Sequence, residues 1–73
     1  MHIKQLTHLG TVYTQPRQIA QVLTQTGFGW VTKATTNNAV IELHPTGLVW
    51  RSGEWLAGNW VCGTWLGGSF GQA

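Results

Sequence analysis

The chain has 73 residues, of which only 8% are charged, and its formal net charge at pH 7 is +2. This length predicts one small domain, residues 1–73, whose core is marginal by itself. The one cysteine, Cys62, excludes a disulfide within a single chain, so either very good packing or oligomerisation has to supply the missing stability. The four basic residues are dispersed, which argues against a basic patch that binds nucleic acid.

The hydropathy pattern predicts neither a membrane span nor a signal peptide. No apolar run approaches the ~20 residues that cross a bilayer. Residues 2–10 lack the apolar core of a signal peptide. An unpaired cysteine is compatible with a reducing compartment, so we expect a cytoplasmic protein.

The N-terminal part predicts short strands followed by a helix. Residues 2–13 are expected to form one or two strands interrupted near Gly10. Residues 15–26 are expected to form the helix, with Thr14 as its N-terminal cap and Gly27 in the left-handed position after its end. The apolar positions of the helix have i, i+3, i+4 spacing and are Ile19, Val22 and Leu23.

Residues 30–43 predict a β-hairpin. Its arms are residues 30–36 and 39–43, and its turn is Asn37-Asn38, because asparagine tolerates the positive φ of a tight turn. This register places Lys33 opposite Glu42, a favourable cross-strand pair. The following residues, 44–47, contain proline and glycine and predict a second turn before the next strand.

Residues 50–70 repeat aromatic and glycine residues with a period of five. The aromatic positions are Trp50, Trp55, Trp60, Trp65 and Phe70, and a glycine lies two places before the last four, at Gly53, Gly58, Gly63 and Gly68. A flat strand repeats every two residues and a helix about every 3.6, so neither gathers these rings on one side. We predict bent short strands with a corner near each glycine, since glycine accepts positive φ.

The residues that follow the tryptophans define a second apolar side. In a strand they point away from their neighbours, and they are Leu56, Val61 and Leu66. Either they form an outward apolar stripe or the tryptophans form an outward aromatic ladder. An exposed apolar side marks a partner surface. We therefore expect a homo-oligomer whose interface includes Leu56, Val61, Leu66, Trp60 and Trp65.

The pentads resemble the pentapeptide-repeat family, which places a small residue two positions before a large apolar one. Gly58-Asn59-Trp60 and Gly63-Thr64-Trp65 match this spacing, with glycine for the usual alanine and tryptophan for the usual leucine. Members of that family wind a four-sided β-helix, so the resemblance implies a β-solenoid-like segment with four pentads per turn. The segment also looks like the Trp-Gly-Gly pentads of small phage proteins, which implies a phage origin and a location in the host cytoplasm.

These elements together predict a mainly β protein with one short α-helix, in the α+β class. Residues 1–49 form its strand–helix–hairpin part and residues 50–70 its repeats, and homo-oligomerisation completes the fold.

A few residues are candidates for a binding site. Trp50 and Trp55 could stack on a flat ligand while Arg51 binds an anionic group. In the alternative, the tryptophans fill a core or an interface and Arg51 pairs with Glu54. Cys62 occupies a position that small residues hold in the neighbouring repeats, which predicts a buried side chain.

The polar residues favour no catalytic or metal chemistry. The histidines His2, His8 and His44 lack metal-ligand spacing, and only two carboxylates are present. We expect no cofactor and no enzymatic activity. The leading hypothesis is a self-associating protein that holds a flat or anionic, nucleotide-like ligand in a tryptophan-lined pocket between subunits. The alternatives are a structural fibre element and an inhibitor that docks on a host protein.

Overall fold

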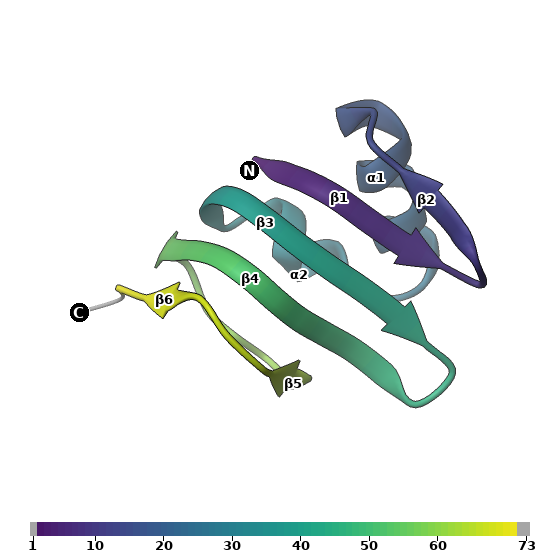
Figure 1. Ribbon diagram of the computed structural model, residues 1–73. Helices are drawn as coiled ribbons and strands as arrows, with labels where there is room; N and C mark the ends of the chain where they lie inside the picture. The colour runs from purple at the N-terminus through teal and green to yellow at the C-terminus, as the bar shows by residue number, and fades with distance from the viewer. Residues whose placement is uncertain (1, 72–73) are drawn as a thin grey trace.

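The computed structural model describes residues 2–71, which form one mixed β-sheet with two helices on one face (Figure 1). The strands are β1 (Ile3–His8), β2 (Thr11–Tyr13), β3 (Thr35–His44), β4 (Gly47–Ala57), β5 (Thr64–Trp65) and β6 (Ser69–Phe70), and the helices are α1 (Pro16–Gln25) and α2 (Gly29–Thr32). The strand order is β2-β1-β3-β4-β5, with β6 also beside β4. A mainly β fold with a short helix is therefore confirmed.

The helix α1 was placed correctly by the sequence, except for its cap. Its N-terminal cap is Gln15 rather than Thr14, and no side chain bonds the first turn. At the other end Gly27 has a φ of +90°. The Phe28 N–H then donates to the Leu23 carbonyl at 2.8 Å, which closes a Schellman turn. This turn brings Phe28 and α2 back against the core.

The hairpin predicted around Asn37-Asn38 is wrong. Residues 29–32 form α2, and β3 runs without a turn through both asparagines. Asn38 has the expected positive φ, 51°, but uses it for a bulge in which β3 has one more residue than β4. Lys33 therefore never pairs with Glu42, which lies opposite Val49. The predicted turn at residues 44–47 is the true hairpin connection, between β3 and β4.

Bulges explain how a five-residue period keeps tryptophans on one face. Ile41 pairs with Trp50 while Val40 pairs with Ser52, so Arg51 is an extra residue in β4. One extra residue exchanges the two faces of a strand. Trp50 and Trp55 are therefore both fully buried although an odd number of residues separates them.

The chain after β4 turns once and returns beside it. In Figure 1 this segment runs behind the link between β5 and β6, farther from the viewer and so on the side of the helices. The two short strands then pair with β4 in parallel, Trp65 beside Trp50 and Phe70 beside Trp55, an offset of 15 residues. We call Trp50 and Trp55 the first aromatic layer, and Trp65 and Phe70 the last. Three pentads, not the four implied by the family resemblance, therefore separate one layer from the next.

The glycines of the pentads have the predicted backbone conformation, with one difference. Gly53, Gly58, Gly63 and Gly68 all have positive φ. Gly53, however, lies inside the continuous strand β4 rather than at a corner that ends it. Gly68 lies directly against Gly53, where an added Cβ would collide with the Gly53 backbone. Glycine at this position therefore lets two layers approach to strand-pairing distance.

Candidate functional site: the aromatic end of the repeats

The pentad rings form one continuous aromatic cluster. Trp65 stacks on Trp50 with centroids 4.9 Å apart and an interplanar angle of 9°. Phe70 lies parallel to Trp55 at 6.3 Å and 3°. The ring of Trp60 stands edge-on to its neighbours, 5.4 Å from Trp55 and 5.3 Å from Trp65. Such arrangements are worth about 0.5–1.5 kcal/mol per pair beyond the buried area.

Aromatic residues in and beside α2 cover one side of this cluster. Trp30 of α2 lies 5.4 Å from Trp60 at an interplanar angle of 80°. Phe28 lies 6.2 Å from Trp30, at the start of α2. The hairpin prediction had placed Trp30 on a sheet strand. The Schellman turn instead carries it to the ring of Trp60, far along the sequence.

The burial of the rings falls from the first layer to the last. Trp50 and Trp55 are 0% exposed, whereas Phe70 is 49% exposed. Trp60 and Trp65 are partly buried against the core. Among the described residues, no strand follows β5 and β6 on their outer side. The last layer therefore presents aromatic rings and an unpaired strand edge.

A shallow hollow of about 150 Å³ opens between three of these rings, Trp60, Trp65 and Phe70. Its lining is apolar and comes entirely from the pentads. Small-molecule pockets usually hold about 300–1,000 Å³. This hollow matches one side chain or one small ring in size.

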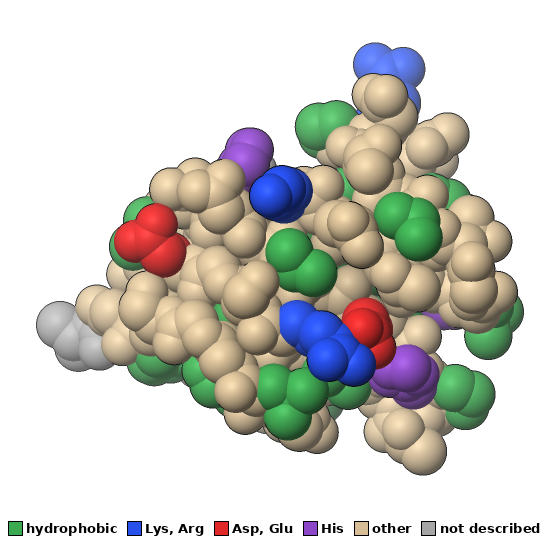
Figure 2. Space-filling model, viewed as in Figure 1, with side chains coloured by type: hydrophobic (Ala, Val, Ile, Leu, Met, Phe, Trp, Pro, Cys, Tyr) green, Lys and Arg blue, Asp and Glu red, His purple; other side chains and the backbone are tan. Residues whose placement is uncertain are grey.

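The edge beside the hollow is formed by two strands of two residues each, and it lacks the charged and proline residues that often protect exposed strands. Residues 55–71 contain no charged residue and no proline. Natural edge strands are usually kept apart by lysine, proline or covering segments. Figure 2 shows hydrophobic side chains along the rim formed by this part of the chain. The edge is therefore open to pairing with another strand.

The predicted stripe of aliphatic residues does face outward. Leu56, Val61 and Leu66 are 44%, 57% and 60% exposed. Their exposure follows from the inward orientation of the tryptophans, since neighbours in an extended chain point to opposite sides. The prediction that Cys62 is buried is wrong, because its side chain is exposed. Cys62 lies in the irregular segment between β4 and β5, where no strand alternation turns it inward.

The ligand residues predicted from the sequence do not converge. Trp50 and Trp55 lie in the core, whereas Arg51 is exposed. The bulge at Arg51 directs its side chain to the sheet face away from the helices, where Figure 2 shows basic, acidic and histidine side chains in contact. The tryptophans therefore have no open ring face beside the guanidinium.

A small ion-pair cluster occupies that outer face. Arg51 donates to the carboxylate of Glu42 through Nε, and His44 Nε2 lies 2.8 Å from the same group. The predicted partner of Arg51, Glu54, instead accepts a hydrogen bond from Asn37 at 3.1 Å. Arg51 reaches Glu42 because the hairpin of β3 and β4 brings these positions together. The hydrogen bonds from Arg51, and then from His44, lower the pKa of Glu42 below its ordinary value.

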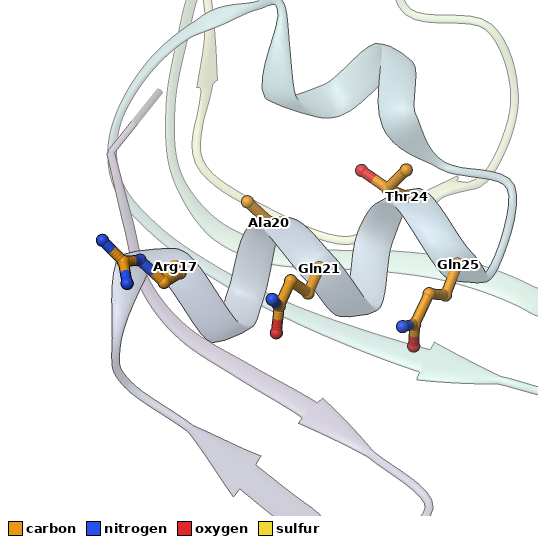
Figure 3. A pocket seen from close by; sticks show the side chains of 5 residues that line it. All are labelled: Arg17, Ala20, Gln21, Thr24 and Gln25. Carbon is orange, nitrogen blue, oxygen red and sulfur yellow. The ribbon is translucent and has the colours of Figure 1, made fainter.

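A second hollow, of about 370 Å³, lies along the outer side of α1 (Figure 3). Its lining comes from one helix and consists of Arg17, Ala20, Gln21, Thr24 and Gln25. Figure 3 shows Gln21 and Gln25 extending side by side from this helix. Because its lining comes from α1 alone, the hollow resembles an open helix surface rather than a built pocket.

Within residues 2–71, no group of three or more histidine, cysteine or acidic side chains is placed to hold a metal ion. Neither helix in the described part of the chain has the length and apolarity needed to cross a membrane. Comparisons of the chain with family models, curated proteins and solved structures gave no match.

Proposed function

We propose that the protein is a non-enzymatic, self-associating binding protein whose partner is a second copy of the same chain. The observation that carries this proposal is the uncovered last layer, where Trp60, Trp65 and Phe70 border a strand edge without charged residues. An apolar aromatic surface of this kind gains free energy when it leaves water. The absence of charge in residues 55–71 removes the usual electrostatic barrier to such an approach.

The identity of the partner follows from what already covers the equivalent surface within the chain. The layer of Trp50 and Trp55 is covered by the layer of Trp65 and Phe70, ring on ring. A pentad layer is therefore complementary to another pentad layer. A second copy carries an identical, uncovered layer, so two copies complete each other and extend one β-solenoid-like stack.

The geometry gives less support to a nucleotide-like ligand. The hollow of about 150 Å³ falls below the usual range for such molecules, about 300–1,000 Å³. Arg51, the cation predicted to hold an anionic group, does not line it. Ligand binding, docking on a host protein and a cytoplasmic location stay predictions.

A fibre element is the second candidate, because the opposite edge of the sheet also carries exposed apolar side chains. Leu9 and Val12, in and beside β2, are 75% and 54% exposed. Head-to-tail contact between the β2 edge of one copy and the β6 edge of the next would not close, and it would give open growth. A two-fold contact between identical edges would stop at a dimer.

Light scattering at micromolar concentration separates these possibilities. We expect the wild-type protein to have twice the monomer mass. Ser69→Lys places a charge on the exposed edge strand β6 without removing a ring, so this variant is expected to be monomeric with an unchanged circular dichroism spectrum. The matched control is Thr11→Lys on the exposed strand β2, which is expected to leave the dimer intact.

Three results would overturn the proposal. A wild-type protein that stays monomeric would remove it. Association that Ser69→Lys leaves unchanged would move the interface elsewhere. A mass that grows with concentration and collapses with Thr11→Lys as well would favour the fibre.

A further inference from the structure

We infer that the two copies pair the β5–β6 edges antiparallel about a two-fold axis, so that Trp65 of each copy lies against the partner's Phe70. This inference rests on the proposed self-association and specifies its geometry. It begins with the backbone groups of the edge. Leu66 N–H and Gly71 N–H both donate inward to β4, to the carbonyls of Trp50 and Trp55, at 2.8 Å each.

Backbone groups alternate sides along an extended strand, so the residues before these two donors turn their own groups outward. Those residues are Trp65 and Phe70, one in each short strand. Each therefore presents an N–H and a carbonyl to the free edge. In an antiparallel ladder, two such residues facing each other exchange both hydrogen bonds. A pairing of Trp65 with the partner's Phe70 satisfies both residues of both copies at once.

The direction of this contact follows from the side chains. Trp65 and Phe70 both lie over the buried layer, on the helical side of the sheet. A two-fold axis perpendicular to the sheet leaves the rings of both copies on the same face of the joined sheet. The same axis makes the two paired edges antiparallel, so the partner's β6 faces β5. The contact is then isologous, with each residue pair occurring twice.

The residues at the axis permit a close approach. The two-fold axis passes between Gly67 and Gly68, the midpoint between Trp65 and Phe70. The chain bends at these glycines between the two short strands, and this bend lets Trp65 and Phe70, five residues apart, both turn their backbone groups outward. Neither residue has a side chain that could separate the two backbones. The hollows beside Trp60 in the two copies then face each other across the axis, and their apolar linings leave water together.

Disulfide trapping tests this register. The same axis pairs Leu66 with the partner's Ser69 at a non-hydrogen-bonded position, where Cα atoms lie about 4.5 Å apart. A disulfide needs about 4.4–6.8 Å. Identical positions in the two copies would be displaced along the strands by about 10 Å, out of reach. Both residues are exposed, so cysteines there are accessible.

The experiment uses Leu66→Cys and Ser69→Cys, each in a Cys62→Ser background. We expect rapid cross-linking under mild oxidation when the two variants are mixed, and little when either is oxidised alone. Thr11→Cys, on the far edge, is the control and should cross-link with neither.

The two proposals fail in different ways. If light scattering shows dimers of both trapping variants but each cross-links alone as fast as in the mixture, the register is wrong and self-association stands. If dimers form and no combination cross-links, the edges do not pair, and the geometry is again overturned. If all the proteins are monomeric by light scattering, the proposed function fails and this inference fails with it.

Discussion

The first and last aromatic layers have nearly the same chemistry and different surroundings. Trp50 and Trp55 lie between β3 and the next layer and are 0% exposed, whereas Phe70 is 49% exposed. In each layer the two rings are five residues apart, and a glycine lies two residues before the second ring, Gly53 in the first layer and Gly68 in the last. The difference therefore comes from neighbours rather than from composition. A layer of this kind is buried only when strands lie on both sides of it.

Truncation of a ring should destabilise the first layer much more than the last. Trp55→Ala should destabilise the fold by about 3–5 kcal/mol, because it opens a cavity among fully buried rings. Phe70→Ala should cost about 1 kcal/mol in the monomer, because its ring is half exposed before any change. Urea unfolding followed by circular dichroism, at a concentration too low for association, measures both values.

If Trp55→Ala does not fold, Trp55→Phe keeps a ring and should still lose more stability than Phe70→Leu. Equal losses in the two layers would mean that their burial in solution is the same, contrary to the structure.

The contact between the layers can be tested by adding one Cβ atom at Gly68. Gly68 and Gly10 have φ values of +93° and +80°, but only at Gly68 would a Cβ meet backbone, that of Gly53. Gly10→Ala should cost about 1–2 kcal/mol from backbone strain alone. Gly68→Ala should cost more, or should detach β6. Thermal unfolding reports the difference, since 1 kcal/mol shifts Tm by roughly 4–8 °C in a domain of this size. A Tm loss at Gly10 as large as that at Gly68 would contradict the layer contact.

The ion-pair cluster on the outer face of the sheet, away from both layers, should contribute less to stability than either layer. Because hydrogen bonds lower the pKa of Glu42 in the folded state, the contribution of Glu42 to stability is present above its unfolded pKa, about 4.3. That contribution is lost as the pH falls through the lower folded pKa. Glu42→Gln should therefore reduce the fall in Tm between neutral and acid pH, and Arg51→Gln should reduce it similarly. An unchanged acid dependence in both variants would show that this exposed pair contributes nothing measurable.

Local sequence signals predicted the elements whose causes are also local. The strands around Gly10, the body of α1 and the turn at residues 44–47 depend on nearby residues, and the structure confirms them. The positive φ of the pentad glycines and of Asn38 was also predicted. What Asn38 does with that φ depends on β4, whose paired residues on either side of the bulge lie 12 to 17 positions along the chain from their partners in β3.

The candidate site was predicted in part. Trp60 and Trp65 were expected at an interface, and the structure brings them together at the uncovered end with Phe70, which the sequence analysis had left out of the site. The signal for Phe70 was its place as the final aromatic of the series. Trp50 and Trp55 were expected to meet a ligand, and their burial arises from a return of the chain 15 residues later.

The repeat, the positions of its glycines and the shortage of charge at its end follow directly from the order of the amino acids, because these are properties of residue type and spacing. The number of pentads between two layers, the choice of covered rings and the position of the open edge follow only from the folded chain. Those properties depend on bulges and on pairing between distant strands, where one added residue reverses the direction of every side chain that follows.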